Sequence, residues 1–354
     1  MTDGIKTYGS EELLKEIKYK EPVFICVIGT TETSKIPEIS GAGASPELTE
    51  YTPAADVELM VLGTVRCMES IPQTIVGKAV APTPALLTKA ALELANIPFT
   101  IVNAGCKIKP EIEFISFSQD YGRDIRTGKA IKNPLEIYEN GRELGAELSR
   151  RHDYLVIGES IAAGTTSALG VLKALGYSAN EKVSGSMPTN PHNLKIDVVN
   201  EGLKNAGLDP ETDEIDPFQA IAAVGDPTIP AIAGLVLGGD VPVILGGGTQ
   251  MIGICAIIKA INPHFDFSRV NIATTKFVAE DETADLFDLA KQVDKDLTIH
   301  VVDPDFENSD HEGLKNYLTG FVKEGAGAGG AMFTALIRGN SVEKLRKKIE
   351  KVCK

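Results

Sequence analysis

The sequence predicts an α/β protein with a parallel, Rossmann-like sheet, helices on both faces, and a small helical subdomain made by the N- and C-terminal segments. Two observations support this fold class. Short apolar stretches without polar alternation, such as Val23–Ile28, are typical of parallel strands buried on both faces. Segments of helical composition alternate with these stretches along most of the chain, which favours repeated βα units.

Each expected element has a local reason in the sequence. Unbroken apolar runs predict strands at Val23–Ile28, Phe99–Val102, Tyr154–Ile157, Pro242–Leu245, Val270–Ala273 and Thr298–Val302. Helical spacing or composition predicts helices at Ser10–Ile17, Ala85–Ala95, Leu135–Arg150, Thr165–Leu175, Leu194–Ala206, Ala231–Leu237, Met251–Ile261, Gly313–Thr319, Ala328–Ile337 and Val342–Val352. Ser10 can cap the first of these helices, and Gly176 and Gly207 stop two others.

These elements divide the chain into an α/β core and a smaller part. Residues 21–310 hold the alternating units, whereas residues 1–20 and 311–354 are poor in strands and are expected to pack together as the helical subdomain. The segment Gly29–Ser45 is a long loop rich in Gly, Thr, Ser and Pro. Loops of this length inside a compact domain are usually functional or mobile.

Charge and composition exclude several classes of partner. The 354 residues carry a formal net charge of -14, whereas a nucleic-acid-binding protein needs a basic face. The basic run Arg346–Lys348 falls near the end of a predicted helix, where it complements the helix dipole. The polar N-terminus does not resemble a signal peptide, and no apolar stretch is long enough for a membrane span. We therefore expect a soluble, cytoplasmic protein that binds neither nucleic acid nor membrane.

The cysteines and histidines indicate neither disulfides nor a metal site. The five cysteines include no CxxC pair, and Cys26 and Cys255 lie in apolar runs that predict buried thiols. The five histidines are scattered, without an HxxxH pair. The sequence therefore predicts a reduced, intracellular protein that uses no metal and no cofactor.

Ligands of open α/β sheets bind beyond the carboxyl ends of the strands, so the segments that follow strands are candidate binding sites. The sequence Tyr154–Gly170 runs from a buried strand through Gly158 and Glu159 into Gly164-Thr165-Thr166 at the start of a helix. Glycine permits close approach, and a helix N-terminus favours a phosphate. An ordinary βα turn with a threonine cap explains the pattern equally well.

A second segment, Pro242–Met251, ends a strand in three successive glycines: Gly246, Gly247 and Gly248. A turn rarely needs all three, so close approach of a ligand or of another backbone is the better interpretation. Asp226 lies upstream of this segment. A helix cap is the favoured role for it, and a place in the site is the alternative.

Two further residues are candidates for chemistry. Glu324 precedes a small-residue stretch that opens a helix, and apolar residues surround it in sequence. In an apolar pocket its pKa would rise towards neutrality and make it a general base, although a simple helix-dipole partner is the alternative. Lys195 near the start of a helix is either a solvated lysine or a phosphate contact.

In this order, the segments resemble the nicotinate-nucleotide:dimethylbenzimidazole phosphoribosyltransferase family, and its archaeal branch most closely. The family motif GExGIGNTT is similar to Gly158–Thr166, with Ala162-Ala163-Gly164 in place of the Ile-Gly-Asn run. The family motif RLGEGTGAA is similar to Phe321–Gly329, and PVxLDGF to Pro242–Gly248, with Gly246 replacing Asp. The resemblance runs over roughly Glu21 to Leu336.

This resemblance implies a nucleotide-binding core and a set of roles. Glu324 would be the catalytic base. Nicotinate mononucleotide and an aromatic base would be the substrates, and the protein a homo-oligomer. The implied phosphate contacts are Gly158, Glu159, Gly164, Thr165, Thr166 and Lys195, and the implied substrate-binding loop is Gly246, Gly247 and Gly248. The bacterial PPGSLG motif beside the acceptor base is absent, and we expect residues 29–55 to take its place.

Two other functions remain open from the sequence. A phosphoribosylpyrophosphate-dependent transferase has a similar apolar strand followed by a loop with threonine. That class requires two adjacent acidic residues after the strand, where this chain has only Glu159, and it requires magnesium. A non-catalytic nucleotide sensor of the same fold would bind the nucleotide without turnover. A Rossmann dehydrogenase is disfavoured because no GxGxxG follows a strand.

Overall fold

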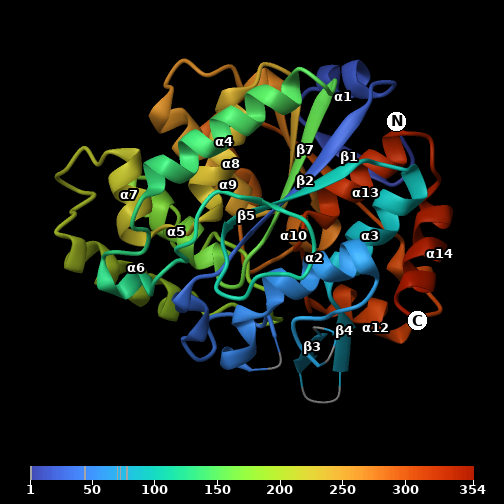
Figure 1. The fold of residues 1–354 in the computed structure, drawn as a ribbon, viewed down its shortest axis with the longest axis horizontal. Coiled ribbons are helices and arrows are strands. Elements are labelled where there is room, and N and C mark those ends of the chain that lie inside the picture. The colour runs from blue at the N-terminus through green and yellow to red at the C-terminus, as the bar shows by residue number, and fades with distance from the viewer. Residues whose placement is uncertain (1, 44, 70, 72, 77–78) are drawn as a thin grey trace.

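A computed structural model describes residues 2–43, 45–69, 71, 73–76 and 79–354. The described residues form an eight-stranded sheet in the order β1-β10-β9-β8-β7-β2-β5-β6, and a separate hairpin of β3 and β4 (Figure 1). Every neighbouring pair in the large sheet is parallel except the edge pair β1 and β10. This mostly parallel sheet confirms the predicted fold class.

The elements have the following bounds. The strands are β1 Ile5–Tyr8, β2 Pro22–Gly29, β3 Gln73–Val76, β4 Ala79–Pro82, β5 Phe99–Gly105, β6 Ile115–Ser116, β7 Tyr154–Ser160, β8 Val243–Gly246, β9 Val270–Thr275 and β10 Thr298–Val302. The helices are α1 Glu12–Ile17, α2 Thr52–Leu62, α3 Pro84–Ala95, α4 Pro134–Ser149, α5 Gly164–Ala174, α6 His192–Ala206, α7 Pro217–Val224, α8 Thr228–Gly238, α9 Thr249–Ile261, α10 Lys276–Ala279, α11 Leu286–Val293, α12 Glu312–Lys315, α13 Ala328–Ile337 and α14 Val342–Val352. Short 3₁₀ helices lie at Glu32–Lys35, Pro46–Glu50, Ile125–Thr127, Phe267–Arg269, Phe306–Asn308 and Asn316–Thr319.

Helices cover both faces of the sheet, which explains the unbroken apolar strands. Every residue of β2 is buried. Its alternate side chains Val23, Ile25 and Val27 pack with one apolar cluster, which also receives α4, α5, α8, α9 and α11. The intervening side chains Phe24, Cys26 and Ile28 pack with a second cluster, which receives α3, α13 and α14. Figure 1 shows these two helical layers on opposite sides of the strands.

Pairs of glycines allow α13 to pack closely against the ends of two central strands. A methyl group at Gly158, in β7, would lie 2.4 Å from the Cα of Gly327, and one at Gly246, in β8, would lie 3.0 Å from the Cα of Gly330. Only glycine permits backbones to approach this closely. The segment that precedes α13 therefore lies beside the carboxyl ends of the strands, where α5 and α9 begin.

Most elements expected from the sequence are present, with ends shifted by a few residues. The strand at Thr298–Val302 and the helices at Ala328–Ile337 and Val342–Val352 have the predicted bounds. The sequence did not predict α2, α7, α11 or the β3–β4 hairpin. The division into a core and a helical subdomain stays a prediction, although Ile5–Tyr8, in the predicted subdomain, is a strand of the main sheet. Among the described residues, no helix is both long and apolar enough to cross a membrane.

A buried carboxylate fixes α2 to the loops around it. Glu58 is fully buried, and its Oε2 accepts hydrogen bonds from the backbone N–H groups of Arg66 (2.5 Å) and Cys67 (2.9 Å). Its Oε1 accepts one from Glu111 (2.7 Å). Burial alone raises the pKa of Glu58, but the backbone hydrogen bonds outweigh it and hold the pKa below its ordinary value.

We expect Glu58→Gln to lower the free energy of unfolding by about 1–3 kcal/mol at neutral pH, because an amide cannot accept all three bonds. A lowered pKa means that the native state binds fewer protons than the unfolded state. The carboxylate therefore stabilises the fold fully above pH 4.5, its ordinary pKa, and less as the pH falls below that value. Urea unfolding of both proteins at neutral and acidic pH measures this difference. A difference that is the same at both pH values would contradict the assignment.

Candidate functional site

A cavity lies at the carboxyl ends of the central strands. Five segments of the chain line it: residues 39–56, 159–165, 184–186, 248–250 and 322–326, each in part. Gln73, Thr83, Pro84 and Val278 complete the described lining. The loop after β7 and the start of α9 therefore meet at one site, as their places after strands predicted. The segment before α13, which follows no strand, joins them there.

The helix α5 presents its N-terminus to this cavity. Gly164 and Thr165 line the cavity, and the structure shows no side-chain cap on α5. The first N–H groups of such a helix attract anions. Thr166 is buried without a hydrogen-bond partner for its hydroxyl among the described residues.

Gln250, at the start of α9, packs against Gly164 and lines the same cavity. A methyl group at Gly164 would lie 2.1 Å from the Oε1 of Gln250, so any larger residue would displace this side chain from its place. The Nε2 of Gln250 is buried and makes no hydrogen bond to the described residues. An amide donor is therefore available beside the α5 N-terminus, and the motifs alone did not indicate it.

The turn before α5 keeps a glycine-like conformation without glycine. Ala163, the N-cap residue, has φ of 65°, in the left-handed region. This position holds glycine in the family motif that the segment resembles. An L-residue is strained there by about 1–2 kcal/mol, so the surrounding loop holds Ala163 against its own preference.

The three glycines at the end of β8 and after it each lie against a different neighbour. Gly246 faces α13, as described above. A methyl group at Gly247 would lie 2.8 Å from the side chain of Met251, and one at Gly248 would lie 2.9 Å from that of Val278. Of the three, only Gly248 lines the cavity. Close approach of another backbone, one of the two predicted reasons for the glycine run, therefore accounts for Gly246, whereas Gly247 meets only a side chain.

Lys195 is buried behind the α5 N-terminus and does not line the cavity. Its Nζ donates to the Oγ1 of Thr165 (3.1 Å), the backbone oxygen of Ser184 (2.8 Å) and the Oδ1 of Asn190 (2.9 Å). These three bonds use all the hydrogens of an ammonium group. Burial lowers the pKa of Lys195 to about 7, with a further contribution from the charge of Lys323. Lys195 thus orients Thr165 towards the cavity from behind.

Glu324 lies in the cavity lining at the start of α13. Both its carboxylate oxygens accept from the backbone N–H of Gly329, at 3.1 and 3.2 Å. Burial raises the pKa of Glu324 to about 7, although backbone hydrogen bonds oppose this rise. Glu324 thus contacts the N-terminus of α13, as the dipole interpretation expects, and also lines the cavity, while its role as a general base stays a prediction.

Two further carboxyl groups, those of Glu159 and Asp226, are buried near this part of the cavity. Glu159 lines the cavity, and burial together with the charges of Asp226, Glu324 and Asp56 raises its pKa well above the ordinary value. Asp226 lies outside the lining and just before α8, whose N-cap residue is Pro227, and its Oδ1 accepts from the N–H (2.9 Å) and hydroxyl (2.6 Å) of Thr228, the first residue of α8. This contact at the start of the helix favours the capping interpretation of Asp226 over a place in the cavity lining.

Asp56, on α2, is a site residue that the sequence motifs did not indicate. It lines the cavity and accepts hydrogen bonds from the hydroxyls of Ser160 (2.7 Å) and Thr83 (2.8 Å). Burial raises its pKa to about 6, although these two bonds lower it. The available signal was one acidic residue within the small and apolar run Pro53–Val57.

The segment before α13 is strained and tethered at several points. Val322 has φ of 44° and Ala326 φ of 50°, both uncommon for residues with a side chain. The N–H of Val322 donates to the backbone oxygen of Ser186 (3.2 Å), and the Oγ1 of Thr88 donates to the backbone oxygen of Ala326 (2.9 Å). These bonds fix the backbone on both sides of Glu324.

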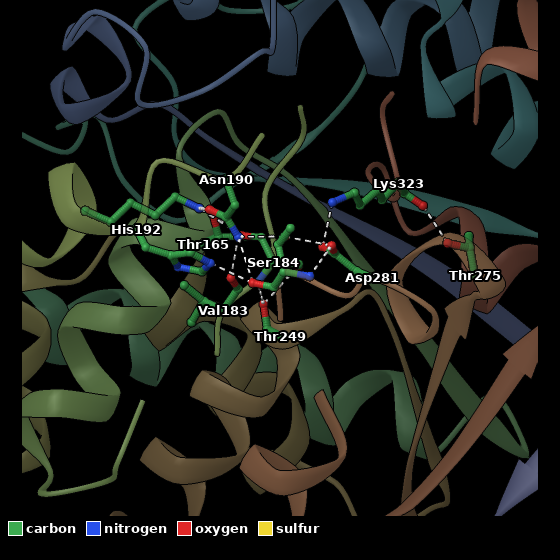
Figure 2. Close-up of polar contacts among 11 residues, drawn as sticks. Thr165, Val183, Ser184, Asn190, His192, Thr249, Thr275, Asp281 and Lys323 are labelled. Carbon is green, nitrogen blue, oxygen red and sulfur yellow. Dashed lines mark hydrogen bonds and ion pairs between the residues drawn. The ribbon is translucent and has the colours of Figure 1, made fainter. Parts of the chain in front are cut away.

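A buried ion pair also lies in this segment. The Nζ of Lys323 is 2.6 Å from the Oδ2 of Asp281, and both side chains are almost fully buried. The Oδ1 of Asp281 accepts from the N–H and hydroxyl of Thr283. Figure 2 shows Lys323 and Asp281 facing each other beside the polar group around Ser184. The sequence did not indicate this pair.

The predicted site residues fall into two groups by position. Glu159, Gly164, Thr165, Gly248 and Glu324 line the cavity. Behind them, outside the described lining, lie Gly158, Thr166, Lys195, Gly246 and Gly247. The structure thus brings all of these segments to one place, and the role of each residue stays a prediction. No cluster of three or more His, Cys, Asp or Glu side chains suited to a metal ion occurs within the described ranges.

We expect Ala163→Gly to raise the free energy of unfolding by about 0.5–1 kcal/mol. Relief of left-handed strain is worth about 1–2 kcal/mol, and the added entropy of the unfolded glycine offsets about half of it. Urea unfolding measures the change. Ala168→Gly in the middle of α5 is the matched control and should lower stability by about 1 kcal/mol. A loss of stability in Ala163→Gly similar to that of the control would contradict the strain at this position.

Comparisons with known proteins agree with this arrangement. A family model described as "Phosphoribosyltransferase" matches residues 88–266. The chain is 56% identical over 353 residues to a UPF0284 protein of Methanothermobacter thermautotrophicus, covering 100% of this chain and 98% of the relative. It is 43% identical over 337 residues to a UPF0284 protein of Saccharolobus solfataricus, covering 94% of this chain and 92% of the relative.

Solved structures show the same fold at low identity. The nicotinate-nucleotide-dimethylbenzimidazole phosphoribosyltransferase of Thermus thermophilus has a TM-score of 0.59 and 15% identity, over 94% of this chain and 86% of that one. A structure of CobT from the same organism has a TM-score of 0.56 and 16% identity, over 92% and 83% of the two chains. The resemblance inferred from the motifs is confirmed, and the chain belongs to this phosphoribosyltransferase family, among its archaeal UPF0284 members.

Proposed function

We propose that the protein transfers the phosphoribosyl group of nicotinate mononucleotide to a benzimidazole-type base, releasing nicotinate and giving an α-riboside phosphate for the lower ligand of a cobamide. Membership of the family supports phosphoribosyl transfer in general. The observation that carries the specific reaction is Glu324, a half-buried carboxylate with its pKa raised to about 7 that shares one cavity with the uncapped start of α5.

The start of α5 is the proposed phosphate site. Its first N–H groups have no side-chain cap, and Thr165, whose hydroxyl accepts from Lys195, lines the cavity next to them. Lys195 donates to that hydroxyl, so its charge acts on a bound phosphate from one residue away. A phosphate here would also favour the charged form of Lys195, whose pKa burial has lowered.

The acidic lining suits the rest of the donor. Asp56, Glu159 and Glu324 face a cavity that would receive the positively charged, glycosylated ring nitrogen of nicotinate mononucleotide. That nitrogen leaves with the bonding electrons when the bond to C1′ breaks, so the ring departs as neutral pyridine bearing its carboxylate. The donor carries no pyrophosphate, and its leaving group needs no metal ion for neutralisation.

Glu324 is the proposed general base for the acceptor. As one ring nitrogen of the base forms a bond to C1′, Glu324 accepts the proton from the other ring nitrogen. The attack comes from the face opposite the leaving group and inverts the anomeric centre from β to α. A pKa of about 7 leaves a large ionised fraction at neutral pH and makes the carboxylate a stronger base than an exposed glutamate. Base catalysis of this type contributes about 10²–10⁴-fold to the rate.

We expect Glu324→Gln to bind nicotinate mononucleotide but to lose about 10²–10⁴-fold in turnover. In the wild-type protein, kcat/KM should rise with pH around a midpoint near 7, because the base works only when deprotonated and its pKa is raised to that value. The rise near pH 7 should disappear in Glu324→Gln. Glu350→Gln, on α14 outside the cavity lining, is the control and should retain wild-type turnover. Wild-type turnover by Glu324→Gln would remove the proposed role.

The reaction itself is tested by incubating the purified protein with nicotinate mononucleotide, a chelator and a panel of bases. The panel contains dimethylbenzimidazole, benzimidazole and adenine, and chromatography measures released nicotinate. We expect release that depends on a base and is unaffected by the chelator. Binding of the nucleotide without release by any base would favour a non-catalytic nucleotide-binding protein instead. Release of pyrophosphate from phosphoribosylpyrophosphate, only with magnesium, would favour the other transferase class.

A further inference from the structure

The cavity offers one basic side chain to an anionic ligand. Among the described residues that line it, Lys323 is the only lysine, arginine or histidine, whereas Asp56, Glu159 and Glu324 are acidic. Lys195 is close but lies behind Thr165, and its ammonium hydrogens are all used within the protein. An anionic group that enters the cavity away from the α5 N-terminus therefore has Lys323 as its available cation.

Lys323 keeps donor capacity for such a group. Its Nζ makes one hydrogen bond within the described part of the chain, to the Oδ2 of Asp281 at 2.6 Å, and an ammonium group can make three. The side chain is only 5% exposed, so water does not readily satisfy the remaining hydrogens. The ion pair therefore holds a charged, partly unsatisfied donor at the wall of the cavity.

A gain in stability alone does not explain why a buried ion pair lies at this position. Burying two charges is expensive, and apolar side chains of similar volume often stabilise a protein as well or better. The segment that carries Lys323 is also strained, because the β-branched Val322 has a positive φ. Strained backbone that is held in place by its surroundings is concentrated at binding and catalytic sites. These two features favour a role for Lys323 in recognition.

The proposed donor supplies a second anionic group that needs a partner. This step rests on the proposed function. Nicotinate mononucleotide carries a phosphate, assigned above to the start of α5, and a carboxylate on its pyridine ring. In a cavity lined by three acidic residues, that carboxylate would be repelled unless a cation paired with it. Lys323 directly precedes Glu324 in the chain, and both residues line the cavity, so a cation is available to that carboxylate within the same site.

We propose that Lys323 binds the ring carboxylate of the donor nucleotide, that Asp281 positions Lys323 for this contact, and that the pair makes the site select a nicotinate nucleotide over the corresponding nicotinamide nucleotide. The amide of the nicotinamide nucleotide is neutral and gains no ion pair from Lys323. It also leaves the charge of Lys323 without a partner other than Asp281. The specificity thus arises from one charge-assisted contact between Lys323 and the carboxylate on the pyridine ring.

Calorimetric binding to three ligands separates this role from the alternatives. The ligands are nicotinate mononucleotide, nicotinamide mononucleotide, which lacks the carboxylate, and nicotinate riboside, which lacks the phosphate. We expect Lys323→Met to weaken both nicotinate ligands by about 10- to 100-fold, the usual value of a charged hydrogen bond, and to leave nicotinamide mononucleotide nearly unchanged. The preference for the nicotinate nucleotide over the nicotinamide nucleotide should therefore collapse.

Two further variants control for charge and folding. Asp281→Asn keeps the ammonium group of Lys323 but removes the carboxylate that positions it, so the preference for the nicotinate nucleotide should fall, though by less than in Lys323→Met. Lys323→Met combined with Asp281→Asn removes both charges and avoids an unpaired buried carboxylate, so it serves if Lys323→Met alone does not fold. Lys89→Met is the matched control. Lys89 is mostly buried and paired with Glu93 at 2.7 Å, but it lies on α3 outside the cavity lining, and its loss should not change the preference.

Three outcomes would overturn the proposal. The first is equal binding of the two mononucleotides by the wild-type protein. The second is an unchanged preference in the variants that lack Lys323. The third is an equal loss for both mononucleotides with no loss for the riboside, which would place Lys323 on the phosphate. Failure of the proposed reaction looks different: the wild-type protein would bind the nicotinate ligands with this preference but release no nicotinate with any base.

Discussion

The close contact of α13 with the ends of β7 and β8 is the constraint on which the site depends. Gly158 meets Gly327 and Gly246 meets Gly330 at distances that exclude any side chain. This contact brings the segment before α13 to the carboxyl edge of the sheet, where α5 and α9 also begin. Three helix N-termini therefore share one cavity. The carboxylate of Glu324 accepts a hydrogen bond at the N-terminus of α13, whereas the N-termini of α5 and α9 have no side-chain cap.

Electrostatics within this cavity follow from burial more than from individual pairs. Burial is the largest cause of the raised pKa values of Asp56, Glu159 and Glu324. A set of carboxyl groups that share one desolvated place cannot all ionise at neutral pH, because each charge disfavours the next. Their surroundings then give the carboxyl groups different pKa values. Backbone N–H groups limit the rise in the pKa of Glu324 to about 7. The pKa of Glu159 is raised well above its ordinary value, because the charges of its acidic neighbours add to the effect of burial.

The fold and the location of the site followed from local sequence, but the composition of the site did so only in part. Unbroken apolar strands such as Tyr154–Ile157 and the glycines after them predicted a parallel sheet and placed a ligand at its carboxyl edge. Glu324 was recognisable because small residues follow it. Asp56 was not, because α2 carries no motif and reaches the cavity only through tertiary packing. The pair of Lys323 and Asp281 was also missed, since 42 residues separate its members.

The two buried lysines show why burial and residue type alone do not define a role. Lys195 and Lys323 are both nearly inaccessible, and each lies next to a predicted site residue. Lys195 uses its hydrogens on Thr165, Ser184 and Asn190, all neutral acceptors, so burial lowers its pKa and its charge depends on an arriving anion. Lys323 instead has a permanent carboxylate partner in Asp281. Lys323, which lines the cavity, can therefore favour one ligand over another through a direct contact, whereas Lys195 acts on a bound anion only through Thr165.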